Sequence, residues 1–389
     1  MRLPLSRGRS LKAVSSIIFT RGEFMELFAS IKRRRQDKAS LAAIEQGSAF
    51  ARMGRYEEAI EAYREAVRFA PDDIYARHRL GEIYCELGRY QEAEVVYRET
   101  IRIAPDDENG LYALGDLLVA TGRDEEAVDI LLRTIRIKPR NFKAHHRLGQ
   151  VHENAGRTDD AICEYLTALD IQPSFIDAQF GLGNAYQHLG RFSDAIRAFR
   201  QIISQRPDHA EAHYKLGVCY SRSNLPEEAL EAYREAIRCR PDYAEAHYNR
   251  GVVYHKLGRY NGAIESYKQV ARIKPDHTEA HYNLGAAFSK LGLYEEAAEA
   301  YIRATRLRPE FADAYYNLGG VFRSMGRLVE ASEAYIQAIR FRPDYAEAHY
   351  KLGHTHLQMG DKRAAIEEYR ILKSLDNDMA EKLFRDIYS

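Results

Sequence analysis

The sequence lacks several features on which many functions depend. It contains no tryptophan, and its 57 Lys and Arg residues are balanced by 57 Asp and Glu residues, so the whole chain exerts no long-range attraction on nucleic acid. No apolar run is long enough to span a membrane. The four cysteines, Cys85, Cys163, Cys219 and Cys239, form no Cys-x-x-Cys pair. We therefore expect ordinary reduced thiols rather than a disulfide framework.

Proline, by contrast, is regularly spaced. Only Pro4 and Pro226 lie outside a series with an interval of 34 residues. That series is Pro71, Pro105, Pro139, Pro173, Pro207, Pro241, Pro275, Pro309 and Pro343. Glycine keeps the same interval from Gly47 to Gly353, and alanine keeps it from Ala59 to Ala365. A fixed interval of this length indicates one small supersecondary unit repeated along the chain.

Each repeat is predicted to form two helices. In the repeat 244–277, apolar residues recur at helical spacing, and Gly258 interrupts them with a residue suited to the left-handed end of a first helix. Pro275 stops the second helix, and Asp276 is predicted to cap the helix that follows. The missing side chain at Gly251 should let the two helices approach closely, beside a bulky ring such as that of Tyr267.

Ten such repeats run from residue 40 to residue 379, with repeat 1 at 40–73 and repeat 10 at 346–379. Repeat 6 departs from the pattern at its turn, where Asn224 and Pro226 still suit a left-handed cap and a first-turn proline. We expect a basic N-terminal segment with a capping helix at 1–39 and a C-terminal capping helix at 380–389. The apolar stripes of these caps are Phe24, Leu27, Phe28 and Ile31 at one end, and Ala380, Leu383, Phe384 and Ile387 at the other.

The pattern resembles the tetratricopeptide repeat family over about residues 40–379. One repeat fills every place of the family's Leu-Gly, aromatic, Ala, aromatic, Ala and Pro pattern, with Leu284, Gly285, Phe288, Ala297, Tyr301, Ala304 and Pro309. The resemblance implies an all-α fold, a right-handed superhelical α-solenoid of about ten 34-residue helix-turn-helix repeats whose first helices line a concave groove. It also implies scaffolding or peptide binding without catalysis. Repeats carrying A-E-A-H-Y-N, such as 244–249, are similar to the repeat region of O-linked N-acetylglucosamine transferase.

Motifs for chemistry are absent. The sequence has no His-Glu-x-x-His, no phosphate-binding glycine loop and no nucleophile motif, so no catalytic residue, metal or cofactor is predicted. Histidines recur at the fourth position of several repeats, at His145, His213, His247, His281 and His349. Because neighbouring repeats are separated by packed helices, we interpret these residues as packing or interface histidines rather than metal ligands.

The first-helix side chains that do not face the core are the candidate peptide-binding groove. Tyrosine at position 5 and asparagine at position 6 would offer flat apolar area and backbone-binding amides. The alternative is that the tyrosines merely pack between helices and the amides are solvated. The candidates are Tyr214, Lys215, Arg222, Tyr248, Asn249, Lys256, Tyr282, Asn283, Lys290, Tyr316, Asn317, Tyr350 and Lys351. Small residues at position 9, Val218, Val252, Ala286 and Gly320, would leave room for a ligand.

The N-terminus leaves further alternatives open. Residues 1–40 carry ten basic and three acidic side chains, and the run Lys32–Arg35 is either a solvated helix face or a contact for RNA or anionic lipid. Residues 1–24 resemble an organellar transit peptide, or translation starts at Met25.

The leading function is a non-enzymatic scaffold in the cytoplasm that binds extended segments of other proteins. Two alternatives remain, a recognition subunit for a separate glycosyltransferase and an RNA- or membrane-surface adaptor. Self-association is a further expectation, whereas a small-molecule substrate is not expected.

Overall fold

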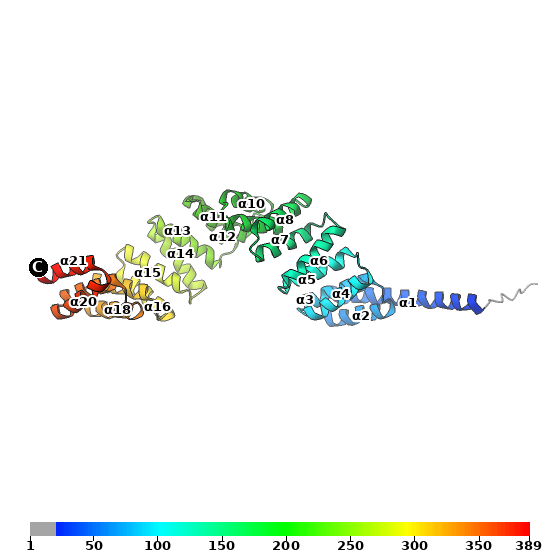
Figure 1. Ribbon diagram of the computed structural model, residues 1–389, viewed down its shortest axis with the longest axis horizontal. Helices are drawn as coiled ribbons and strands as arrows, with labels where there is room; N and C mark the ends of the chain where they lie inside the picture. Colours follow the sequence, from blue (N-terminus) through cyan, green and yellow to red (C-terminus); the bar gives the residue numbers. More distant parts are fainter. Residues whose placement is uncertain (1–20) are drawn as a thin grey trace, which may run out of the picture. The chain divides into compact units, whose positions relative to one another are not determined.

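The computed structural model describes the chain from residue 21 to residue 389, with side chains described except at 21–24, 27, 28 and 31. The expected N-terminal stripe and all side chains of residues 1–24, the segment that resembles a transit peptide, therefore lie outside the described side chains. The described chain is built of α-helices without strands. It divides into two compact units, Met1–Gln172 and Pro173–Ser389, which we call the N-terminal unit and the C-terminal unit (Figure 1).

Successive helices of each unit pair as hairpins, two helices to a repeat. The N-terminal unit contains α1 (Arg21–Arg52), α2 (Tyr56–Phe69), α3 (Ile74–Glu86), α4 (Tyr90–Ile103), α5 (Glu108–Ala120), α6 (Asp124–Ile137), α7 (Phe142–Asn154) and α8 (Thr158–Ile171). The C-terminal unit contains α9 (Ile176–His188), α10 (Phe192–Gln205), α11 (Ala210–Arg222), α12 (Pro226–Cys239), α13 (Ala244–Lys256), α14 (Tyr260–Ile273), α15 (Thr278–Lys290), α16 (Tyr294–Leu307), α17 (Ala312–Ser324), α18 (Leu328–Phe341), α19 (Ala346–Gln358), α20 (Lys362–Leu375) and α21 (Asn377–Tyr388). The all-α repeat fold expected from the sequence is confirmed.

The turn inside repeat 7 forms for the reason that the sequence suggested. Gly258 has a φ of 70°, in the left-handed region that ends α13 and that a side chain would strain. In repeat 6 the left-handed residue is Asn224, with a φ of 58°, and α12 begins at Pro226. Both turn assignments are therefore correct.

The predicted helix cap at Asp276 is wrong by one residue. His277 caps α15, because its Nδ1 accepts a hydrogen bond of 3.2 Å from the backbone N–H of Ala280. Pro275 and Asp276 form the turn itself, so the chain enters helical geometry one residue later than expected. In α3 the residue at the same place is Asp73, which caps that helix in the same way.

A ring packed against a glycine holds the two helices of a repeat together. A Cβ atom placed on Gly251 would lie 2.7 Å from Cε1 of Tyr267, so only glycine fits beneath this ring. Tyr267 is 1% exposed and Ala263 is fully buried. Tyr97 covers Gly81 of the N-terminal unit in the same way. Full burial of a ring is among the larger single contributions to a core, because dispersion and hydrophobic terms both scale with its area.

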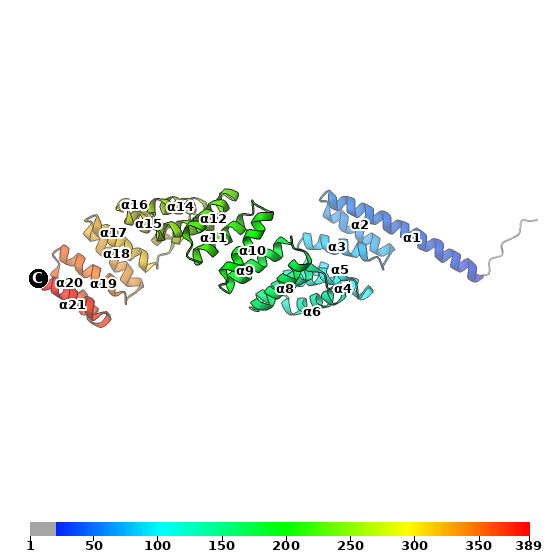
Figure 2. The same ribbon diagram turned by 90° about the horizontal axis from the view of Figure 1, so that it is seen from above.

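The ends of the array are helical. α1 runs without interruption from the basic segment into the first helix of repeat 1 (Figure 2). Residues 32–35 lie exposed on it. At the other end, α21 packs on α19 and α20. It buries Leu383 and Ile387, whereas Phe384 is 44% exposed. None of the helices in the described part of the chain is both long and apolar enough to cross a membrane.

Candidate binding surfaces

First helices of neighbouring repeats touch one another in both units. The contacting pairs are α3 with α5, α5 with α7, α11 with α13, α15 with α17, and α17 with α19. Between α13 and α15 the hydrogen bond from Asn283 to Tyr248 makes the link. The outward side chains of these first helices form a surface in each unit, which we call the first-helix face. Helical geometry places positions 5, 6, 9, 12 and 13 of a repeat on one side of its first helix.

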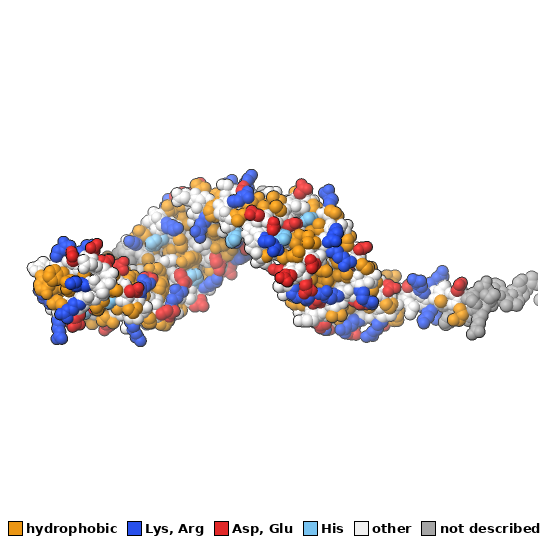
Figure 3. Space-filling view, in the orientation of Figure 1, with side chains coloured by type: hydrophobic (Ala, Val, Ile, Leu, Met, Phe, Trp, Pro, Cys, Tyr) orange, Lys and Arg blue, Asp and Glu red, His pale blue; other side chains and the backbone are white. Residues whose placement is uncertain are grey.

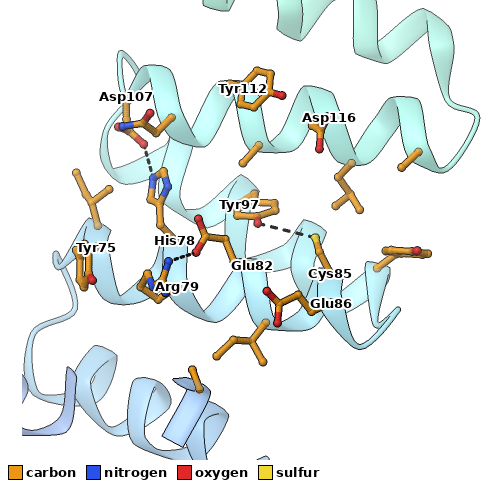
Figure 4. A pocket seen from close by; sticks show the side chains of 18 of the residues that line it. Tyr75, His78, Arg79, Glu82, Cys85, Glu86, Tyr97, Asp107, Tyr112 and Asp116 are labelled. Atoms are coloured by element: carbon orange, nitrogen blue, oxygen red, sulfur yellow. Dashed lines mark hydrogen bonds and ion pairs between the residues drawn. The ribbon is translucent and has the colours of Figure 1, made fainter. Parts of the chain in front are cut away.

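In the N-terminal unit this face borders an open cavity of about 960 Å³, lined mainly by α3 and α5 (Figure 4). Its lining includes His78 and Tyr112 at position 5, Arg79 and Ala113 at position 6, Glu82 and Asp116 at position 9, Cys85 at position 12, and Glu86 and Ala120 at position 13. The lining also includes Tyr75 and Asn109 at position 2, so position 2 borders the same space as these five positions.

Polar pairs order the cavity wall. The Nε2 atom of His78 lies 2.6 Å from Oδ2 of Asp107, and Arg79 donates to Glu82 at 2.5 Å (Figure 4). Asp116 forms an ion pair with Arg147. Glu82 and Asp116 repeat the same position one repeat apart, so the wall carries a row of carboxylates.

The thiol in this cavity is not set up as a nucleophile. Burial raises the pKa of Cys85, and its Sγ atom lies 3.9 Å from the hydroxyl of Tyr97. A reactive cysteine needs the opposite shift, because the thiolate is the attacking species. All four cysteines are free.

In the C-terminal unit, positions 5 and 6 form a ladder across the first helices. The side-chain amide of each asparagine donates from Nδ2 to the hydroxyl of the tyrosine in the repeat before it. The bonds are Asn249 to Tyr214 at 3.1 Å, Asn283 to Tyr248 at 3.0 Å, and Asn317 to Tyr282 at 2.9 Å. The structure thus brings these six candidates together in pairs, and the asparagines are not simply solvated.

The tyrosines of the ladder are packed rather than free. Tyr248 lies between Tyr267 of its own repeat, with ring centroids 5.8 Å apart, and His277, which stacks on it at 5.0 Å. Tyr282 lies in the same way between Tyr301 and Phe311. These rings are half-buried. Burial raises the pKa of Tyr214, Tyr248 and Tyr282. Most of the surface of each ring therefore packs against other side chains, which was the alternative to ligand binding.

The remaining candidates are cations or lie at the ends of the ladder. Lys215 and Lys351 take the place of asparagine in repeats 6 and 10 and are half-buried. Tyr316 packs between Tyr335 and Tyr345. Tyr350 lies edge-on to His354, with ring centroids 4.6 Å apart. At position 13 the side chains are Arg222, Lys256 and Lys290, which lie at the surface.

Sequence reasoning missed two groups. Position 12 adds His255 and Arg323 to the face of the C-terminal unit, and the entire cavity of the N-terminal unit was overlooked. The signal for both was the helical spacing, since positions 9, 12 and 13 are three and four residues apart and share one side of a helix. Residue type alone does not reveal these positions, whereas the helical spacing does.

The recurring histidines have a structural role. Each places Nε2 at 3.0–3.1 Å from the carbonyl oxygen of the repeat-ending proline six residues earlier, fixing the turn between repeats. The pairs are His145 with Pro139, His213 with Pro207, His247 with Pro241, His281 with Pro275 and His349 with Pro343. The described residues include no cluster of His, Cys, Asp or Glu that could hold a metal ion.

Comparison with known proteins agrees with this geometry. Family models described as tetratricopeptide repeat match residues 44–108, 180–244, 88–150, 232–265 and 346–379. A further model, described as TPR repeat, matches 154–190, 254–292, 290–326 and 319–360. The chain belongs to the tetratricopeptide repeat family. Tetratricopeptide repeats are a scaffold for protein–protein interaction, and solenoids of this kind use extended surfaces for binding.

Several solved tetratricopeptide repeat structures are similar over part of the chain. The MamA protein is 28% identical, covers 44% of this chain and 94% of its own, and has a TM-score of 0.42. MamA from Desulfovibrio magneticus RS-1 is 27% identical over 43% of this chain and 96% of its own, with a TM-score of 0.41. YrrB, described as a TPR protein with an unusual peptide-binding site, is 23% identical over 48% of this chain and 96% of its own, with a TM-score of 0.42. None of the curated proteins compared matches the chain.

Proposed function

We propose that the C-terminal unit binds extended segments of other proteins along its first-helix face, and that the protein acts as a scaffold without catalysing a reaction. The observation that carries the proposal is the ladder of Asn249, Asn283 and Asn317. An amide has two N–H donors and a carbonyl acceptor, so one bond to a tyrosine hydroxyl orients the group and leaves further groups for a ligand.

An oriented ladder suits an extended backbone. A peptide chain presents the same N–H and C=O groups at regular intervals, and the amides recur once per repeat. Because the tyrosines are already packed, they contribute rigid walls, and binding costs little side-chain entropy at these positions. Affinity would come from the amides, whereas selectivity would come from the side chains around them.

Short synthetic peptides displayed on an array, with affinities of the captured peptides measured by fluorescence anisotropy, test this proposal. The variant is the triple substitution Asn249→Ala, Asn283→Ala and Asn317→Ala. Its matched control is Tyr214→Phe, Tyr248→Phe and Tyr282→Phe, which deletes the same three hydrogen bonds but keeps the amides. Both variants should lose similar stability.

The asparagine variant should lose about 1–3 kcal/mol of affinity, because it removes the groups that would contact the peptide. The tyrosine variant should lose clearly less, because it removes only the bond that orients each amide. Equal affinity in the two variants and the wild-type chain would contradict the proposal. Equal losses in both variants would assign the ladder to stability alone.

A further inference from the structure

The first-helix face of the C-terminal unit carries cations without carboxylates. Positions 5, 6, 9, 12 and 13 of repeats 6 to 10 contain no Asp or Glu. The cations at these positions are Lys215, Arg222, Lys256, Lys290, Arg323 and Lys351. None of the six has an ion-pair partner among the described residues. Their charge is therefore not compensated on the face itself.

Two half-buried groups on the face, His255 and Lys351, have lowered pKa values, mainly because of burial and secondly because of a neighbouring cation. Burial and the nearby Lys290 ammonium lower the pKa of His255. Burial and the guanidinium of Arg323 lower the pKa of Lys351 in the same direction. A cation beside His255 and another beside Lys351 add positive charge at places where an anion would be stabilised.

Carboxylates lie along one edge of the face, at position 2, and most of them are already neutralised. Glu245 binds Lys274, Glu279 binds Arg308, and Asp313 binds Arg342. Glu211 and Glu347 remain at this edge without an ion pair among the described residues, and Asp386 of α21 lies 3.0 Å from Nε2 of His354. The six cations outnumber the three of these acidic groups, Glu211, Glu347 and Asp386, that have no Lys or Arg partner among the described residues. Over the side of the molecule drawn in Figure 3, acidic and basic side chains are interspersed. The absence of acids is therefore confined to these five positions and is not general to the surface.

We infer that the first-helix face of the C-terminal unit selects acidic extended segments, whose Asp and Glu side chains meet Arg222, Lys256 and Lys290 while their backbone meets the asparagine ladder. The inference rests on the proposed function and names its ligand class. Position 9 carries small residues such as Val252 and Ala286, so no long or charged side chain stands between the asparagine ladder and the three cations. The corresponding positions of the N-terminal unit carry Glu82, which pairs with Arg79, Asp116, which pairs with Arg147, and Glu86, which has no ion pair among the described residues. This unit should therefore bind such a ligand less tightly.

The test uses the full chain and three fluorescent peptide probes of one length, built on a Gly-Ser backbone with Glu, Gln or Lys at alternate positions. Anisotropy is measured at low and high salt. The variant is Arg222→Gln, Lys256→Gln and Lys290→Gln, three surface side chains without ion pairs among the described residues. The control, Arg303→Gln, Arg306→Gln and Arg370→Gln, removes the same charge from the surface of α16 and α20.

The Glu probe should bind at least tenfold more tightly than the Gln probe, and the Lys probe should not bind this face. The variant should weaken the Glu probe by about 20-fold, the control should change it less than about threefold, and high salt should reduce the difference.

Equal binding of the Glu and Gln probes at the ladder would overturn the inference but leave the proposed function intact. Equal losses in variant and control would assign the preference to net charge and also overturn it. The inference would be overturned as well if single-stranded RNA bound this face more tightly than the Glu probe, or if a second copy of the chain occupied the face and excluded the probe. If the asparagine variant loses binding of all three peptides and the cation variant does not, the affinity comes from the ladder and the cations supply only the preference for acidic peptides.

Discussion

The two units share one helical hairpin and differ in what that hairpin displays. Tyr97 covers Gly81 in the N-terminal unit as Tyr267 covers Gly251 in the C-terminal unit. At position 13, however, repeat 2 presents Glu86 and repeat 7 presents Lys256. Positions that pack and positions that face outward are thus separate sets in the repeat, so charge on the face changes without disturbing the core.

The two units also differ in the charge that their first-helix faces carry. Position 9 of repeats 2 and 3 carries carboxylates, whereas repeats 6 to 9 carry small residues there. Position 6 gains asparagine in repeats 7 to 9, and with it the ladder to the tyrosines. One family of repeats therefore offers two chemically different surfaces in a single chain.

The largest expected effect comes from breaking the shared core in one unit at a time. Tyr267→Ala should cost about 3–5 kcal/mol, because it leaves a cavity the size of a ring. Hydrogen exchange should lose protection first in the repeats around α13 and α14, since contacts run between neighbours. Tyr97→Ala is the equivalent variant of the N-terminal unit and should loosen the repeats around α3 and α4. Uniform loss of protection from end to end in either variant would contradict this locality.

A smaller effect distinguishes the ladder from ordinary tyrosine packing. Tyr248→Phe should cost about 1 kcal/mol, because the amide of Asn283 loses its acceptor. Tyr316→Phe is the matched control, since Lys351 replaces the asparagine that would bind its hydroxyl. Urea unfolding of the two variants measures the difference. Equal free energies of unfolding would show that the ladder contributes no stability.

The sequence predicted the fold well because the packing residues recur at a fixed interval. Gly251, Gly258 and Tyr267 each do what their type and position suggested. The binding face was predicted less well. Hydrogen bonds such as Asn283 to Tyr248 join side chains 35 residues apart, and no local pattern records which of two outward groups turns toward the other. The cap at His277 was missed because a histidine seldom signals a cap.

Histidine pairs give an effect of about the same size that depends on pH. His145 has both ring nitrogens beside acceptors, Glu164 at 2.6 Å and the Pro139 carbonyl at 3.1 Å, and the Glu164 hydrogen bond raises its pKa. For His349, burial opposes the charge but the Glu368 carboxylate raises the pKa above its ordinary value. A raised folded-state pKa stabilises the fold below the unfolded pKa of 6.5, and the benefit is lost as pH rises through the folded pKa.

Glu164→Gln should therefore cost about 1 kcal/mol at a pH below 6.5 and less at alkaline pH. Glu65→Gln, a surface carboxylate without an ion pair among the described residues, is the control and should show no such dependence. His247 is the opposite case, because burial lowers its pKa. The stability that its neutral ring contributes to the fold is therefore lost as pH falls below 6.5. Denaturant midpoints of the wild-type chain and of both glutamate variants, measured across this pH range, test these expectations. A cost of Glu164→Gln that does not change with pH would contradict the assignment.

The smallest expected effect is on the stability of the cation variant. Arg222→Gln, Lys256→Gln and Lys290→Gln should change the free energy of unfolding by less than about 0.5 kcal/mol each, because surface side chains without partners contribute little. Thermal unfolding checks this directly. A large loss would mean that these cations support the helices and that any loss of binding reflects folding.

The most direct measurement is site mapping with a photo-crosslinking Glu probe, followed by mass spectrometry of the adducts. The account predicts adducts on the first helices α11, α13, α15 and α17 of the C-terminal unit, displaced by excess unlabelled Glu probe but not by the Gln probe. Adducts on second helices, on the N-terminal unit, or equally displaced by both peptides would contradict it.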